Sequence, residues 1–161
     1  MILVADCSPL IALASCNGLH LLEGLFDTVI VPEAVYREAV VSDKPEAQQL
    51  KEYLKDKIRK IDPSHPILLD GFSDLGETEA MVLYRQVSAD KLLIDDKRGR
   101  RVAKINHINT IGSLGILLAA KHVRLIDQVS PYVTQILSSD IYLSTDLIAT
   151  VMNIAGEKQP L

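Results

Sequence analysis

Two adjacent carboxylates follow directly on an apolar stretch in LLIDDKRGRR, which runs from Leu92 to Arg101. Asp95 and Asp96 repel each other, and burying either one without a cation or a hydrogen-bond donor is strongly unfavourable. The pair therefore requires a partner. Either the arginines that follow or a divalent metal ion would satisfy this requirement.

Other carboxylates occupy comparable points of the chain. Asp6 follows the apolar stretch ILVA, Glu38 lies near the end of a helical pattern, and another helix carries acids in its first turns. The candidate acidic cluster is Asp6, Glu38, Glu79 and Asp96, with Glu77 and Asp95 as near neighbours. Clustered carboxylates either take up protons or bind hard cations such as Mg²⁺ or Mn²⁺. The set therefore predicts a metal site that activates a water for in-line attack on a phosphodiester.

Short apolar stretches alternate with helical patterns along the whole chain. Residues 2–5, 28–31, 58–61, 92–94 and 109–111 are expected to be extended, and helices are expected between them and in segments 127–137 and 144–154. Either Ser73 or Asp74 is expected to cap the helix containing GETEA. The alternation predicts an α/β fold, a single three-layer domain whose central parallel sheet of about four or five strands is covered by helices. The carboxyl ends of such strands form the functional crevice, where Asp6, Asp95 and Asp96 would converge.

The length of 161 residues and the 48% hydrophobic content fit one compact domain. We expect a catalytic core over residues 1–125, with residues 126–161 forming C-terminal helices packed on the core or at a dimer interface. Cys7 and Cys16 are expected to be buried thiols, which favours a reducing compartment. No apolar run approaches membrane-spanning length and the first strand does not resemble a signal peptide, so we expect a cytoplasmic protein without membrane contact.

The formal net charge of −4 argues against binding nucleic acid over the whole surface. A local basic patch is still predicted, formed by Lys97, Arg98, Arg100, Arg101 and Lys104. The residues just beyond Asp96 would hold phosphates that flank the reacting one. With no Trp and 4% aromatic residues, base stacking is not expected to be a major source of affinity.

Four stretches together resemble a known family. VADCSPLIAL, VPEAVYREAV, LGETEAMVLY and LLIDDKRGRRVA, in this order, resemble the acidic motifs of the PIN domain. The forms GETEA and IDDKRGRRVA are similar to a prokaryotic branch related to VapC-type toxins. The resemblance runs from Ile2 to the helix after Gly115. It implies a Mg²⁺- or Mn²⁺-dependent ribonuclease that is often dimeric and often paired with an antitoxin protein.

The same resemblance assigns roles to individual residues. Asp6 would be the first metal ligand and Glu38 the second, Glu79 the acid at the start of a helix, and Asp96 the acid after the fourth strand. The family commonly has Thr in the fourth motif, where this chain has Ile94 or Asp95, so the choice between Asp95 and Asp96 stays open. It commonly has Asp where this chain has Glu79, whose longer side chain would shift the metal. The candidates for contacting the RNA substrate are Ser8, Arg98, Arg100, Arg101 and Ser113. No base-reading module is present, and tRNA, rRNA and mRNA all stay open as substrates.

Each acid also has a purely structural interpretation. Asp6 and one of Asp95 and Asp96 would cap helices, Glu38 would be a solvated side chain, and acids early in a helix favour its N-terminus without any metal. Other aspartate-based functions fit less well. The late position of the acidic pair disfavours a phosphoacceptor receiver. An Asp-x-Asp phosphatase is disfavoured because Asp6 is followed by Cys7 and Ser8, and an NTPase because no Gly-rich phosphate loop is present. The alternative function is a catalytically inactive PIN-like module that binds RNA or protein.

Overall fold

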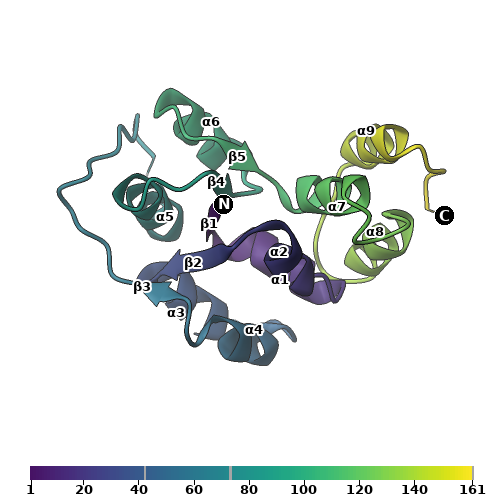
Figure 1. Ribbon diagram of the computed structural model, residues 1–161, viewed down its shortest axis with the longest axis horizontal. Coiled ribbons are helices and arrows are strands. Elements are labelled where there is room, and N and C mark those ends of the chain that lie inside the picture. Colours follow the sequence, from purple (N-terminus) through teal and green to yellow (C-terminus); the bar gives the residue numbers. More distant parts are fainter. Residues whose placement is uncertain (42, 73, 161) are drawn as a thin grey trace.

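A five-stranded, wholly parallel sheet runs through the molecule in the order β3-β2-β1-β4-β5 (Figure 1). The structure is a computed structural model, and it describes residues 1–41, 43–72 and 74–160. The strands are β1 (Ile2–Ala5), β2 (Thr28–Pro32), β3 (Ile58–Arg59), β4 (Lys91–Leu93) and β5 (Thr110–Ile111). The α/β class and the parallel sheet predicted from the alternating pattern are confirmed.

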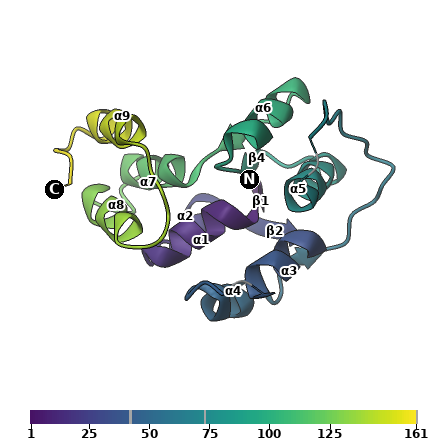
Figure 2. The same cartoon turned by 180° about the vertical axis from the view of Figure 1, so that it is seen from behind.

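Helices connect the strands and cover both faces of the sheet. They are α1 (Cys7–Ser15), α2 (His20–Leu25), α3 (Glu33–Val41), α4 (Ala47–Leu54), α5 (Leu75–Gln86), α6 (Lys97–Ile105), α7 (Ser113–His122), α8 (Ser130–Leu137) and α9 (Thr145–Ala155). Asp74 caps α5, because its side chain accepts a hydrogen bond from the Glu77 N–H. The other expected cap, Ser73, lies outside the described residues. Figures 1 and 2 show α7, α8 and α9 gathered at one end of the molecule and α5 at the other.

Alternate residues of each strand point into two separate cores, as the period of two in a strand requires. One core receives Leu3, Ala5, Val29, Val31 and Leu93 and contains side chains of α1, α2, α3, α7, α8 and α9. The other receives Val4, Ile30, Leu92 and Ile94 and contains side chains of α5 and α6. Because the buried residues of β1, β2 and β4 are apolar on both faces, polar side chains can enter this region from just past the carboxyl ends of these strands.

The C-terminal helices share the first of these cores. Val133 of α8 and Val151 of α9 belong to the same buried cluster as the side chains of α1 and α7. Beyond α9, Glu157 pairs with Lys121 of α7 at 2.7 Å and accepts main-chain hydrogen bonds from Val129 and Ser130, where α8 begins. Residues 126–160 are therefore fastened to the core at several points.

Both cysteines, Cys7 and Cys16, are buried free thiols. Within the described ranges, no helix is long and apolar enough to cross a membrane.

Candidate active site

Asp6 stands where the central strand ends. It follows β1, which lies between β2 and β4, and its main-chain N–H donates to the Leu93 carbonyl of β4 at 2.9 Å. The residue is 3% exposed. Although Asp6 occupies the N-cap position of α1, its carboxylate makes no capping hydrogen bond. The capping interpretation therefore does not explain why a carboxylate is buried here.

Glu77 brings a second buried carboxylate to the same place. It lies in the first turn of α5 and is 6% exposed. Its carboxyl group packs against Gly99 of α6, where an added Cβ would lie 2.9 Å from the Glu77 carboxyl carbon and 2.6 Å from Ile94 Cδ1. Gly99 thus leaves the space that Glu77 fills. Among the side chains of residues 1–41, 43–72 and 74–160, only Glu77 has a buried polar atom, Oε2, without a hydrogen-bond partner.

Glu38 and Asp74 meet over another glycine. A Cβ built at Gly76 would lie 3.1 Å from Glu38 Oε2 and 3.6 Å from Asp74 Oδ1. Glu38 comes from the last turns of α3, and its neighbours Val35 and Ala39 on that helix are buried in the core as their spacing predicts. The packing of α3 against α5 therefore directs the Glu38 carboxylate toward the start of α5.

The two aspartates of LLIDDKRGRR both lie at helix N-termini. Asp96 caps α6 by accepting the Gly99 N–H at 2.8 Å. Asp95 Oδ1 accepts the Ser113 N–H at 2.7 Å, in the first turn of α7. Each side chain thus satisfies a main-chain donor that a helix N-terminus leaves unpaired. Of the two, Asp96 borders the same pocket as Glu77. We name Asp6, Glu38, Asp74, Glu77 and Asp96 the acidic cluster.

Burial and mutual repulsion change the titration of this cluster. Burial raises the pKa of Glu77 from 4.5 to about 8, and the charges of Asp6 and Asp96 add to the effect. Burial likewise raises the pKa of Asp6 from 3.8 to about 7, partly offset by the Cys7 N–H and reinforced by Glu38. The pKa of Glu38 is raised by burial and then by Asp74. The cluster therefore binds protons near neutral pH or requires a cation in their place.

Glu79, the acid that the sequence favoured in α5, points elsewhere. Its Oε2 accepts the main-chain N–H of Ala34 at 3.1 Å, in the first turn of α3. This bond satisfies one of the donors that a helix N-terminus leaves unpaired. The structure thus brings Glu77, predicted only as a neighbour, and Asp74, predicted only as a cap, into the acidic cluster, and it gives Glu79 a structural partner outside it.

The donor set suits a hard divalent cation. Mg²⁺ keeps several waters and binds proteins through one or two carboxylates plus substrate phosphates. In the described part of the chain, no group of three or more His, Cys, Asp or Glu side chains is arranged to hold a metal ion directly. A site with two direct carboxylates does not require such a group. Asp6 and Glu77 are the best candidates for these two, because both are buried and the Oε2 atom of Glu77 has no hydrogen-bond partner among the described residues.

A pocket of about 470 Å³ opens onto the acidic cluster. We name it the acidic pocket; it is lined by Ser8, Phe72, Asp74, Glu77, Asp96 and Arg98. The Arg98 guanidinium lies over the Phe72 ring, 5.9 Å from its centroid. One wall of the pocket is therefore cationic, and Ser8 and Arg98, both predicted to contact substrate, lie at its edge.

Helix α6 carries an exposed row of positive charge that begins at this pocket. Its basic residues are Lys97, Arg98, Arg100, Arg101 and Lys104, and all five are exposed. Across the described residues, none of the five forms an ion pair with a carboxylate. Unpaired cations beside a carboxylate cluster are suited to a polyanion that reaches the cluster with its phosphates.

A second hollow of about 690 Å³ adjoins the acidic pocket through Ser8 and Asp96, which line both. Arg100 and Ser113, two more of the predicted substrate residues, line this second hollow. Ser113 is 1% exposed and contributes its main-chain N–H to Asp95. Arg101 lies farther along α6 and borders neither hollow but two smaller depressions.

A comparison with protein families agrees with this arrangement. The family model DUF3368, described as a PIN domain, matches residues 2–157, which is nearly the whole chain. The chain belongs to the PIN-domain family. PIN domains are generally nucleases, a class of hydrolases, and typically use divalent metals. This PIN domain thus has a nuclease fold with its carboxylates at the expected edge of the sheet. A search of curated proteins found no match.

Proposed function

We propose that this PIN domain is a Mg²⁺- or Mn²⁺-dependent endoribonuclease of the VapC-related branch. The observation that supports the proposal best is the buried carboxylate oxygen of Glu77. This oxygen has no hydrogen-bond partner in the described part of the chain, and it lies among Asp6 and Asp96 at the carboxyl edge of the sheet. Burying a carboxylate without a donor is costly, and a cation removes both the desolvation and the repulsion. A structural role alone gives no reason to retain such a group.

The chain's own residues divide the remaining work. A bound divalent cation would supply Lewis-acid activation of water and stabilise charge on the phosphoryl oxygens. Asp6 and Glu77 would hold it, with Asp96 fixed beside them by its bond to Gly99. Glu38 and Asp74, which meet over Gly76, lie at the open side of the cluster where a carboxylate can accept a proton. Arg98 and Arg100 would hold the flanking phosphates.

The test is cleavage of a mixed structured RNA pool by the purified protein with Mg²⁺, Mn²⁺ or EDTA. Asp6→Asn and Glu77→Gln are expected to abolish metal-dependent cutting while the protein stays folded by circular dichroism. Glu79→Gln is the matched control, because it changes the same helix by the same chemistry but lies at Ala34. Loss of activity in Glu79→Gln with retention in Glu77→Gln would refute the assignment. Metal-independent RNA binding without cutting would instead support the inactive binding module.

The proposal extends to partners and location. We propose a cytoplasmic toxin of a toxin–antitoxin pair, supported by the resemblance to VapC-type toxins and by the two buried free thiols. We also propose a homodimer. The exposed apolar side chains Leu137 of α8 and Ile154 of α9, 40% and 65% exposed, support an interface at the C-terminal helices. Light scattering coupled to gel filtration tests this, and a monomer at high concentration would contradict it.

A further inference from the structure

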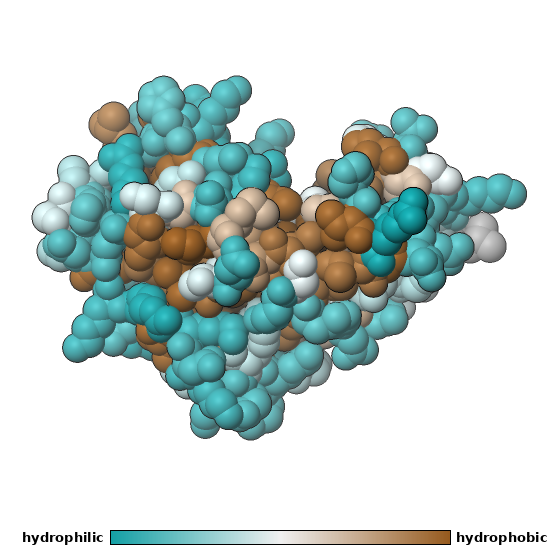
Figure 3. All heavy atoms as spheres, in the orientation of Figure 1, coloured by the Kyte–Doolittle hydropathy of each residue, from teal (hydrophilic) through white to brown (hydrophobic). Residues whose placement is uncertain are grey.

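The hollow beside the acidic pocket has two unlike walls. Lys97 and Arg100 of α6 form one, and the segment from Ile141 through α9 forms the other with Tyr142, Leu143, Leu147 and Val151. Ile111 and Leu114 lie between them. We name this hollow the side groove. Figure 3 shows the surface hollowed between the parts formed by α6 and α9, with hydrophobic side chains in its floor.

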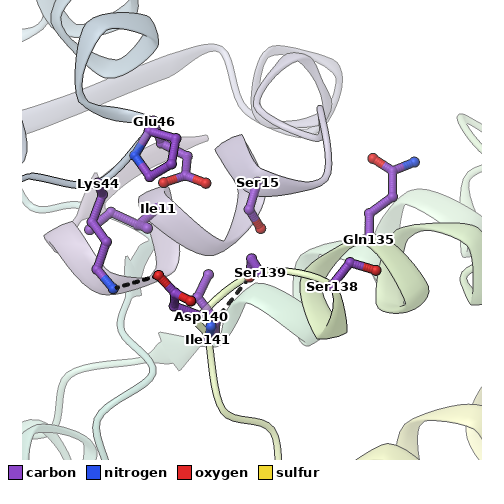
Figure 4. A pocket seen from close by; sticks show the side chains of 10 residues that line it. Ile11, Ser15, Lys44, Glu46, Gln135, Ser138, Ser139, Asp140 and Ile141 are labelled. Carbon is purple, nitrogen blue, oxygen red and sulfur yellow. Dashed lines mark hydrogen bonds and ion pairs between the residues drawn. The ribbon is translucent and has the colours of Figure 1, made fainter.

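The end of the side groove that lies away from the acidic pocket adjoins another hollow. It meets a third hollow of about 430 Å³ at Ile11, Lys44 and Ile141, which line both. There the Lys44 ammonium faces Asp140 at 3.9 Å, across the gap between the α3–α4 connection and the segment after α8 (Figure 4). The side groove is therefore open toward the acidic pocket and bordered by an ion pair at its other end.

Tyr142 distinguishes this groove from the rest of the surface. Seven residues of the chain are Phe or Tyr. All seven are described, and six of them are buried or only partly exposed, whereas Tyr142 is 86% exposed. An exposed aromatic ring that lines a groove offers a flat apolar face for stacking.

We propose that the side groove binds the nucleotide next to the scissile phosphate, with its base stacked on Tyr142 and its phosphate held by Lys97 and Arg100. This inference rests on the proposed ribonuclease function. It assigns recognition to an unpaired base, because a base in a duplex does not present its face to a side chain.

Three observations favour a nucleotide over a peptide or a second protein surface. Lys97 and Arg100 form no ion pair within the described ranges, so both cations can bind an anionic ligand beside the apolar wall, although Asp95 and Asp96 also line the groove. The groove is continuous with the acidic pocket through Ser8 and Asp96. The exposed ring and the two cations lie on opposite walls, which matches a ligand with an aromatic face and an anionic end. Stacking on this one exposed ring departs from the expectation, drawn from the aromatic-poor composition, that base stacking is not a major source of affinity.

The experiment measures binding without cutting. Short single-stranded RNAs, each with 2-aminopurine at a different position, are titrated in EDTA into the wild type, Tyr142→Ala, Tyr142→Phe and Val123→Ala. Val123 is an exposed apolar residue at the opposite end of α7 from the groove, and serves as the control. Removing a stacking ring is expected to weaken binding about 5- to 150-fold. Tyr142→Phe and Val123→Ala are expected to bind like the wild type, and Tyr142→Ala alone to lose 2-aminopurine quenching at one position.

Each other result overturns the inference. Equal affinity and quenching in Tyr142→Ala and wild type would exclude stacking, and so would the absence of measurable RNA binding. Unchanged RNA binding with an altered monomer–dimer equilibrium in Tyr142→Ala would make the groove an interface between copies. A parallel cleavage assay with Mn²⁺ tests the proposed ribonuclease function separately from the stacking site. RNA binding that depends on Tyr142, without any cutting by the wild type, would refute the nuclease proposal alone. Normal cutting by Tyr142→Ala with an unchanged KM would refute the stacking site alone.

Discussion

Replacing Glu77 by Gln should stabilise the metal-free protein above neutral pH. The carboxyl of Glu77 has a pKa of about 8 in the folded chain, against an ordinary value of 4.5. Between these two pH values the folded protein binds more protons than the unfolded chain, so the free energy of unfolding falls as the pH rises. Below pH 4.5 the group is protonated in both states and has no such effect. Gln is neutral throughout and nearly the same shape.

The size of the effect follows from the two pKa values. One pKa unit corresponds to about 1.4 kcal/mol, which sets an upper limit of about 4 kcal/mol at pH 8. Because Glu77 borders the acidic pocket, water screens part of the repulsion, and we expect about 2 kcal/mol. The side-chain amide introduced by Glu77→Gln would also donate to neighbouring carboxylates. The stabilisation should shrink steadily toward pH 5.

The assay is urea unfolding in EDTA at pH 5, 6.5 and 8, followed by circular dichroism. Glu79→Gln is the control, and it should be neutral or destabilising by at most about 1 kcal/mol at every pH, because it removes a charge from the N-terminus of α3. Adding Mn²⁺ should stabilise the wild type and not Glu77→Gln. A Glu77→Gln protein that is less stable than the wild type at pH 8 would refute the reasoning, since Glu77 would then have a stabilising partner.

Three further changes test other contacts. Gly99→Ala places a methyl group 2.9 Å from the Glu77 carboxyl carbon and should weaken Mn²⁺ binding about tenfold or more by calorimetry; unchanged affinity would place the metal elsewhere. Glu157→Gln should lower the free energy of unfolding by about 1–3 kcal/mol at pH 7. Burial opposes ionisation of Glu157, but the hydrogen bonds from Lys121, Val129 and Ser130 outweigh it and lower the pKa of Glu157. The loss of stability should therefore diminish as the pH falls below 4.5. An equal loss at pH 7 and pH 4 would contradict this. Arg100→Ala should reduce the slope of log Kd against log salt for single-stranded RNA by about 0.7, whereas Lys55→Ala, whose ammonium is paired with Glu52 on α4, should leave the slope unchanged.

The fold was predictable because the strands are short, apolar and bounded by clear turn and capping residues. Leu3, Val4 and Ala5 admit no polar face, so a doubly covered parallel sheet is the arrangement that buries them. The position of Asp6 beyond β1 followed from the same pattern. Its convergence with Asp96 required only the rule that parallel strands end at one edge.

The choice between Glu77 and Glu79 was not predictable from the pattern. Residues three and four positions later share the face of each acid, and Ala80, Met81, Val82 and Leu83 are all buried. Because α5 is covered on most sides, Glu77 is buried and Glu79 is partly buried, and periodicity cannot separate them. Their roles depend on tertiary contacts, namely Gly99 for Glu77 and Ala34 for Glu79. The glycine in KRGRR was the signal available, since it leaves room for a neighbouring side chain in an otherwise crowded basic helix.

The bond between Glu157 and the start of α8 has a consequence for ligand size. Glu157 ties the end of α9 to Lys121 and to the first amides of α8, so α7, α8 and α9 form a closed ring of contacts. The wall of the side groove that carries Leu147 and Val151 is part of that ring. The position of this wall is thus held by an anchor outside the groove itself. A ligand that enters the side groove therefore meets a wall whose position is fixed before the ligand binds.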